Sequence, residues 1–184
     1  MTSLGRIFLA VLVVATLALG ASALWRFWRG RTAPPPPAAV ADSTQAGMRA
    51  VTLWFADESG DSLVSETRDM VEQEDLHERV TALVAALDQG PTRRGLAVLP
   101  EGTSVLHAFV DDRGLLTLDL SRAFQQGFHG GSRAEDLAIG SLVRTLGSNL
   151  PEVNRVLIVC GGAPLVSLGG HVPLDRPLGT HDWY

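Results

Sequence analysis

Hydrophobic residues divide the chain into one long apolar run near its amino terminus and a following region in which apolar and polar positions alternate at short periods. The run extends from Ile7 to Trp25 without a charged residue, between Arg6 and Arg26. As a helix with about 1.5 Å rise per residue it reaches roughly 28 Å, close to the hydrocarbon thickness of a bilayer. The pattern predicts a short segment over residues 1–6 and a transmembrane signal anchor over residues 7–25.

A cleaved signal peptide is the alternative to a retained anchor. Residues 7–20 fit a signal-peptide core, and Ala21-Ser22-Ala23 fits a cleavage site of small residues. Lipid attachment would need a cysteine at the end of the run, and the one cysteine of the chain is Cys160. Retention is favoured because aromatic residues and arginines interleave after the run, as they do at a membrane interface: Trp25, Arg26, Phe27, Trp28, Arg29 and Arg31.

Two arguments about orientation conflict. Arg6 lies before the run and three arginines follow it, which by the positive-inside rule places the carboxyl-terminal side in the cytoplasm. That rule loses force for long domains, which cross the membrane largely regardless of charge. We expect a single-pass protein of the cytoplasmic membrane with an extracytoplasmic carboxyl-terminal domain.

The segment 26–47 begins basic and continues rich in proline and alanine, with Pro34-Pro35-Pro36-Pro37 near its centre. This composition buries little apolar surface and favours extended polyproline II, so we interpret the segment as a spacer. Residues 48–184 remain for one domain of common size, which is large enough to form a core without a disulfide or a structural metal.

Short periods in this region predict an α+β domain. Alternating and β-branched residues indicate strands at 51–55, 63–71, 105–110, 115–120 and 155–160. Helical spacing indicates one helix at about 74–88 and another from Ser132 to about Asn149, where Ser132 and Glu135 fit a capping box. The order of elements predicts helices packed on an antiparallel or mixed sheet. We expect a core that contains Leu53, Phe55, Leu118, Val143, Leu146 and Ile158, and obligatory turns at Gly90-Pro91 and Gly161-Gly162.

The charge of the chain changes along its length. Of its fifteen arginines and twenty acidic residues, residues 1–47 hold four arginines and Asp42, a net charge of +3; the rest hold eleven arginines and nineteen acids, a net charge of −8. Nucleic-acid binding needs a basic face that neutralises phosphates, so this domain argues against a nucleic-acid partner. No small-molecule substrate is evident.

The carboxyl-terminal segment contains one cluster of metal-ligand side chains. Zinc needs three or four ligands that converge at about 2.0–2.2 Å, and two prolines interrupt this segment. A solvated tail packed over the sheet is the favoured interpretation, and we predict no metal, cofactor or catalytic residue. The cluster consists of His171, Asp175, His181 and Asp182.

Other polar positions have structural interpretations. His107 and His129 lie in no recognisable triad, and the glycine-rich segment 127–131 is more typical of a connector than of an anion site. Asp119 or Ser121 is expected to cap a turn that brings Phe124 onto the core.

Two further predictions concern a thiol and an ion pair. Cys160 ends an apolar strand and should be buried and inert. Glu66 and Arg68 alternate on one strand face and are expected to form an exposed cross-strand ion pair that contributes at most about 1 kcal/mol.

Several short pieces, in this order and spacing, resemble the GerMN domain of the sporulation and spore germination family over nearly all of residues 50–178. The pieces are Leu53-Trp54-Phe55, Leu63-Val64 through Glu66 and Arg68, Leu87 to Gly90-Pro91, Leu99-Pro100-Glu101-Gly102-Thr103, Leu118-Asp119-Leu120-Ser121 with Phe124, Val143-Arg144-Thr145-Leu146, and Val156-Leu157-Ile158 to Gly161. The resemblance implies a membrane-tethered or lipid-anchored domain outside the cytoplasmic membrane, a fold similar to ring-building motifs, and no established enzymatic activity.

Two functions remain open from the sequence. The leading hypothesis is a non-enzymatic, membrane-tethered interaction domain of the cell envelope that self-associates or docks an envelope protein. The alternative is a peptidoglycan-acting, metal-dependent hydrolase that uses His171, Asp175 and His181. For the first function we expect residues 48–184 to be monomeric at micromolar concentration and low salt, with association favoured by salt or by confinement at a surface.

Overall fold

The computed structural model describes residues 47–183 of the chain. The predicted anchor and most of the predicted linker therefore lie outside the described residues. Residues 46–184 form one compact unit. Across residues 47–183, no helix combines the length and the apolar character needed to cross a membrane.

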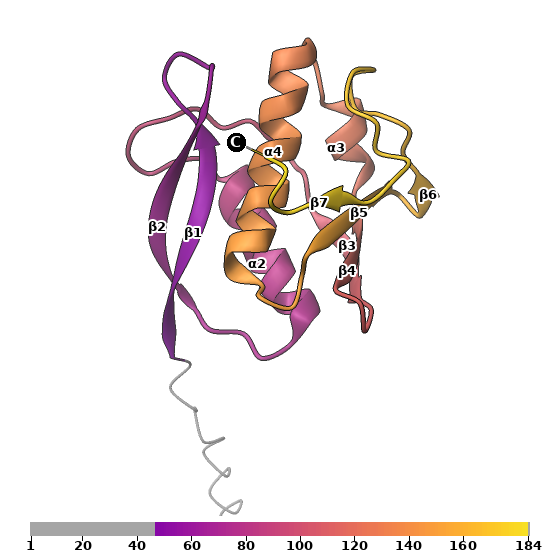
Figure 1. Ribbon diagram of the computed structural model, residues 1–184. Helices are drawn as coiled ribbons and strands as arrows, with labels where there is room; N and C mark the ends of the chain where they lie inside the picture. The colour runs from indigo at the N-terminus through magenta and orange to yellow at the C-terminus, as the bar shows by residue number, and fades with distance from the viewer. Residues whose placement is uncertain (1–46, 184) are drawn as a thin grey trace, which may run out of the picture. The chain divides into compact units, whose positions relative to one another are not determined.

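The predicted elements occur in the predicted order, and one short helix and two short strands are present in addition (Figure 1). They are β1 (Met48–Ala56), β2 (Leu63–Val71), α2 (Leu76–Asp88), β3 (Val105–Val110), β4 (Leu115–Leu120), α3 (Arg122–Gln126), α4 (Ser132–Asn149), β5 (Arg155–Cys160), β6 (Ala163–Pro164) and β7 (Leu178–Gly179). Strand β1 is longer at both ends than the predicted 51–55. Helix α2 begins after Asp75, whose carboxylate accepts the N–H of Glu78 at 3.1 Å.

The strands form two sheets rather than the single sheet that the sequence suggested. Strands β1 and β2 form an antiparallel hairpin. The second sheet has the order β3-β4-β5-β6, with β7 also paired to β5. In it β3 and β4 are antiparallel whereas β4 and β5 are parallel, and the long crossover that a parallel pair requires is supplied by α3 and α4.

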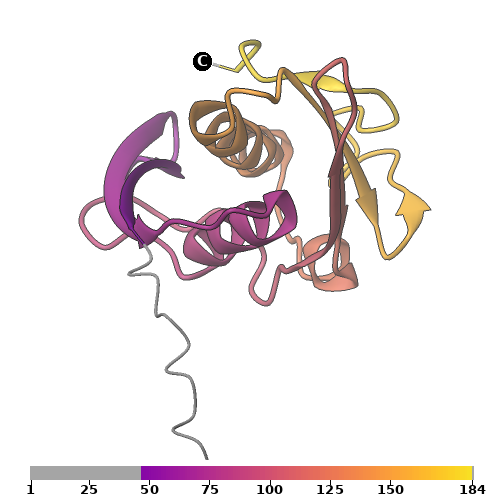
Figure 2. The same ribbon diagram turned by 90° about the horizontal axis from the view of Figure 1, so that it is seen from below.

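Helices α2 and α4 lie between the hairpin and the mixed sheet, so that the domain has three layers (Figure 2). Each sheet turns its apolar face toward the helices, and burial of those faces provides the main stabilisation. The predicted core residues are confirmed: Leu53, Phe55, Leu118, Val143, Leu146 and Ile158 are each at most 1% exposed.

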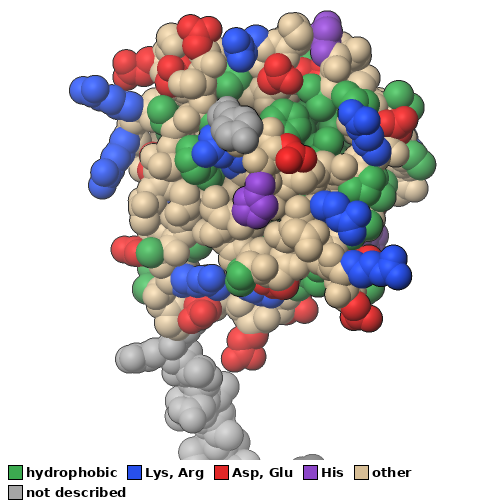
Figure 3. Space-filling view, viewed as in Figure 1, with side chains coloured by type: hydrophobic (Ala, Val, Ile, Leu, Met, Phe, Trp, Pro, Cys, Tyr) green, Lys and Arg blue, Asp and Glu red, His purple; other side chains and the backbone are tan. Residues whose placement is uncertain are grey.

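The predicted turns are confirmed as well. Gly90, Gly161 and Gly162 have φ angles of 81°, 60° and 77°, in the left-handed region that a side chain disfavours. On the face drawn in Figure 3, acidic side chains and arginines are interspersed rather than gathered by sign.

Candidate interaction surface

The inner edge of the hairpin is closed by side chains of a helix. Thr52 donates its backbone N–H to Oδ1 of Asn149 at 2.9 Å, and its carbonyl accepts Nδ2 of Asn149 at 2.7 Å. The backbone N–H of Trp54 donates to Oγ1 of Thr145 at 3.0 Å, and its carbonyl accepts the hydroxyl of Ser141. Ser141, Thr145 and Asn149 recur every four residues on α4 and are all buried. The helix therefore pairs with β1 as a neighbouring strand would.

A partly exposed cluster flanks this ladder. The guanidinium of Arg144 lies 3.4 Å from the ring centroid of Trp54, and the indole N–H donates to Oγ of Ser148 at 3.0 Å. Burial lowers the pKa of Arg144, and the aromatic face offers its cation a favourable partner. Trp54 thereby fastens the outside of β1 to α4.

The outer edge of the hairpin, along β2, is open. Thr52 and Trp54 point their backbone groups at α4, so their partners in the register, Thr67 and Ser65, point theirs away from β1. By the same alternation Asp69 points outward too. Among residues 47–183, no hydrogen bond reaches the backbone of these three residues, and their side chains are exposed. Such an edge is a template for pairing with another strand.

On its inner face, β2 holds the loop that follows α2. Glu66 accepts the N–H groups of Thr92 and Arg93 at 2.9 and 3.2 Å and the hydroxyl of Thr92 at 2.7 Å. Arg68 pairs with Glu66 at 2.6 Å and donates to the carbonyl of Gly90 at 3.1 Å. The ion pair is therefore formed along one strand and is largely buried, which corrects the prediction of an exposed cross-strand pair.

The surroundings of Glu66 favour its charged form. Burial alone would raise the pKa of Glu66, but the hydrogen bonds from Arg68, Thr92 and Arg93 outweigh it and lower the pKa from 4.5 to about 2. The carboxylate thus remains ionised and holds the loop at Thr92 and Arg93 beside β2.

Glu135 serves a second loop, and the predicted capping box is wrong. The N-cap of α4 is Gly131 without a side-chain hydrogen bond, and Glu135 is 0% exposed. Its carboxylate accepts the N–H groups of Leu168 and His171, both at 2.9 Å, and faces Nδ1 of His171 at 3.1 Å. Burial alone would raise the pKa of Glu135, but hydrogen bonds from the backbone of this loop outweigh it and lower the pKa. The glutamate turns inward because this loop supplies more donors than the helix end.

The predicted ligand cluster is not assembled. His171 lines one hollow, while His181 lines another beside Trp54 and Arg144. Asp182 borders the first of these hollows. Throughout the part of the chain that the structure describes, no three His, Cys, Asp or Glu side chains are grouped so as to hold a metal ion.

Asp119 and Ser121 tie loops together instead of capping α3. Asp119 accepts the N–H of Gly162 at 3.0 Å and faces Nδ1 of His107 at 3.3 Å. Ser121 occupies the N-cap position of α3, yet its hydroxyl makes no capping bond and accepts the N–H of Ser104 at 3.1 Å. The prediction that Phe124 reaches the core is confirmed, since it is 0% exposed.

The remaining candidates are placed as follows. Cys160 is buried as predicted, and burial raises the pKa of its thiol, which disfavours the reactive thiolate. The segment 127–131 leads into α4 and, with the exposed His129, lines a hollow of about 680 Å³ opposite residues 96–100.

These features define a small α+β domain in which buried polar groups secure loops and a strand edge. The family model described as Germane, sporulation and spore germination, matches residues 52–166. The chain belongs to this sporulation and spore germination family. A search of curated proteins gives no match.

Solved structures share the fold at low identity. The first GerMN domain of the sporulation protein GerM from Bacillus subtilis is 20% identical with a TM-score of 0.58, covering 71% of this chain and 97% of that one. The tandem GerMN domains of GerM from Bacillus subtilis are 19% identical with a TM-score of 0.59, and the match covers 72% of this chain and 46% of that one. A protein from Clostridium perfringens assigned as a lipoprotein is 23% identical with a TM-score of 0.52, and the match covers 74% of this chain and 90% of that one.

Proposed function

We propose that this chain is a non-enzymatic, membrane-tethered interaction domain of the bacterial cell envelope, held at the cytoplasmic membrane by residues 7–25. In this proposal its work is to associate with another protein or with itself. The observation that carries the proposal is the open edge of β2, whose outward backbone groups no hydrogen bond reaches within residues 47–183.

The use of the buried carboxylates supports an architectural role. Glu66 and Glu135 are saturated by backbone N–H groups of loops, and Asp119 is engaged by a backbone N–H and a histidine. A general acid or base would have to be within reach of a substrate proton. These three groups are committed to the fold.

The hydrolase alternative finds no support in the geometry. His171 and His181 lie in different hollows, and the loop that carries His171 is fixed by Glu135. A stoichiometry measurement on the purified domain tests this point. We expect no zinc that depends on His171; bound zinc at one per chain, lost in His171→Ala and kept in His129→Ala, would overturn the proposal.

Membrane fractionation of the full chain tests the tether. We expect the protein to stay with membranes after salt and alkali, to keep its original amino terminus, and to present its domain to protease added outside the cytoplasmic membrane. Chains that begin at Leu24 and are released in soluble form would show that the segment is a cleaved signal peptide. A domain accessible only from the cytoplasm would reverse the orientation.

A further inference from the structure

Three arginines of the described domain are partly buried, and they differ in what they face. Arg68 pairs with Glu66 at 2.6 Å, and Arg79 pairs with Glu152 at 2.5 Å. Among the described residues no acid pairs with Arg144, whose pKa is lowered by burial. The guanidinium of Arg144 therefore keeps its N–H donors for a group that the described domain does not supply.

Arg144 lines a hollow of about 310 Å³ that three distant segments build. Trp54 comes from β1, Ser148 follows Arg144 on α4, and His181 and Trp183 come from the carboxyl-terminal segment. Figure 1 shows this segment crossing α4 toward the hairpin. The hollow is thus a product of the tertiary fold and not of a single loop.

Two glycines of α4 make room for the carboxyl-terminal segment. Gly140 and Gly147 lie seven residues apart and share one face of the helix. A Cβ on Gly147 would lie 2.6 Å from the Cβ of Thr180, and a Cβ on Gly140 would lie 3.1 Å from the ring of Trp183. The missing side chains let the segment pack directly on the helix, which fixes this wall of the hollow.

The hollow offers hydrogen-bond donors and no acid. The hydroxyl of Ser148 accepts the indole N–H of Trp54 at 3.0 Å and keeps its own proton for donation, beside the N–H groups of Arg144. No aspartate or glutamate lines the hollow. The nearest acid in the sequence, Asp182, has its carboxylate beside Gly179 and borders the other hollow. The hollow is therefore complementary to a carboxylate.

We infer that this hollow receives an aspartate or glutamate side chain of a partner protein, with the carboxylate on Arg144 and a neighbouring apolar side chain against Trp183. This inference rests on the proposed function and names the chemistry of the partner. A guanidinium donates two parallel N–H bonds to a carboxylate, and stacking on Trp54 orients the guanidinium plane beforehand. Tryptophan and arginine are also the residues enriched at the energetic centres of protein interfaces.

A carboxylate-bearing sugar fits the same donors less well. Sugar rings stack on free aromatic faces, and the guanidinium of Arg144 already covers one face of Trp54 at 3.4 Å from the ring centroid. An acidic side chain needs only the guanidinium and the adjoining wall. A sugar acid is therefore the competing outcome of the test.

Titration of the full chain in phosphatidylcholine nanodiscs tests the inference. The probes are the peptide acetyl-Gly-Leu-Glu-Leu-Gly-amide, its twin with glutamine in place of glutamate, and N-acetylmuramic acid. NMR of the arginine Nε–H and indole N–H groups follows binding at the hollow. We expect the glutamate peptide to shift the signals of Arg144 and Trp54 saturably and to bind at least about tenfold more tightly than its twin.

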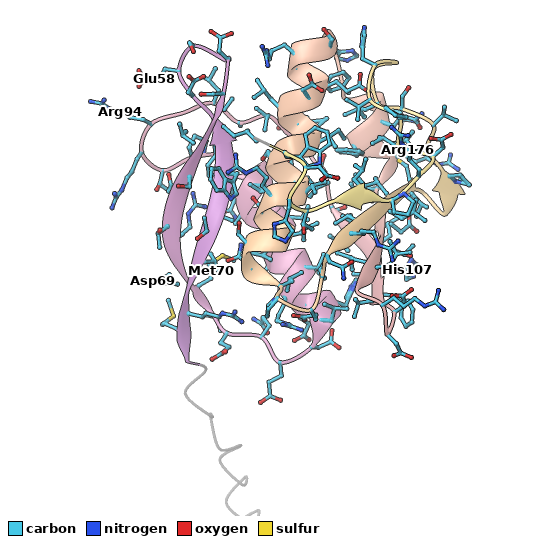
Figure 4. The ribbon with its side chains drawn as sticks, viewed as in Figure 1. Glu58, Asp69, Met70, Arg94, His107 and Arg176 are labelled. Atoms are coloured by element: carbon cyan, nitrogen blue, oxygen red, sulfur yellow. The ribbon has the colours of Figure 1, made fainter. Side chains whose placement is uncertain are left out.

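Three variants locate the binding. Arg144→Gln should weaken binding of the glutamate peptide at least about tenfold, followed by the indole signal of Trp54. Ser148→Ala removes one donor and should weaken it about threefold. Arg176→Gln should leave it unchanged, because Arg176 lines a different hollow and lies on the side of the domain away from the hairpin (Figure 4). The dispersion of each NMR spectrum verifies that the variant is folded.

Each other outcome overturns the inference. Equal binding of the two peptides would show that the carboxylate is not recognised, and equal weakening by Arg176→Gln would indicate a general attraction to positive charge. Saturable binding of N-acetylmuramic acid without binding of the glutamate peptide would assign the hollow to a sugar acid. Absence of any response at Trp54 would reject this contact while leaving the β2 edge, which carries the proposed function, in place.

Discussion

The two edges of the β1–β2 hairpin are treated in opposite ways. Along β1, Ser141, Thr145 and Asn149 of α4 occupy the backbone groups of two strand residues. Along β2, the corresponding groups have no partner among the described residues. Both strands have nine residues, so their length does not explain the difference. A strand edge is closed here by the helix beside it, and the side without a helix remains available.

Hydrogen exchange should show this contrast as its largest effect. The sample is a dilute solution of the domain, residues 46–184. We expect the amides of Thr52 and Trp54 to exchange at least about 100-fold more slowly than those of Ser65, Thr67 and Asp69. The reason is that only the amides of Thr52 and Trp54 are hydrogen-bonded and covered. Exchange measured by NMR decides the point. Comparable protection on both edges in dilute solution would mean that β2 is already paired.

Removal of the helix ladder should cost the most stability. Asn149→Leu leaves the N–H and carbonyl of Thr52 without their partner in a covered site, and we expect the free energy of unfolding to fall by about 3 kcal/mol. Urea denaturation measures it. Ser148→Ala, which removes only the exposed bond to the Trp54 indole, is the matched control and should lower it by less than about 1 kcal/mol. Equal losses would assign the stabilisation to something other than the β1 edge.

Protonation of Glu66 should loosen the loop beside the open edge. The pKa of Glu66 is lowered from 4.5 to about 2, so its contribution is fully present above the unfolded value and is lost as the pH falls through the folded one. At pH 7 we expect Glu66→Gln to lower the free energy of unfolding by about 2 kcal/mol.

Measuring the free energy of unfolding against pH separates the charge of Glu66 from the shape of its side chain. Between pH 5 and pH 2 the wild-type protein should lose stability toward the level of Glu66→Gln. Glu58→Gln, at an exposed turn of the same hairpin, should behave as wild type throughout. A constant difference between wild type and Glu66→Gln down to pH 2 would contradict the assigned role.

The smallest effect is expected at the outside of β1. Arg144→Gln removes the cation from the face of Trp54, and the free energy of unfolding should fall by about 0.5 kcal/mol. Tryptophan fluorescence reports the change of environment directly. A loss above about 2 kcal/mol would show that this contact, and not the ladder of α4, holds the edge of β1.

Much of the fold could be predicted because it depends on periodicity. The apolar stripes of α2, α4 and β4 lie on their buried faces, and hydrophobic patterns report burial directly. The division into two sheets could not be predicted in this way. A strand pattern gives the face that is buried but does not identify the strand or helix at its edge.

The polar contacts were harder to predict because a polar residue in a helix has more than one possible use. Ser141, Thr145 and Asn149 have regular spacing in the sequence, which was the available signal, yet the same spacing is typical of a solvated face. Glu135 matches a capping box in sequence but meets a loop more than thirty residues later, at Leu168 and His171. Local motifs cannot reveal such distant donors.

The ladder between β1 and α4 also affects the order in which the domain folds. Its hydrogen bonds join residues 87 to 97 positions apart, so the amino-terminal hairpin leaves the ribosome long before its partner helix does. Contacts of such high sequence separation are slow to form, and an unpaired strand exposed meanwhile is prone to misassembly. Until residue 149 has been synthesised, β1 is as open as β2, and the nascent hairpin has two unpaired edges where the finished hairpin keeps one.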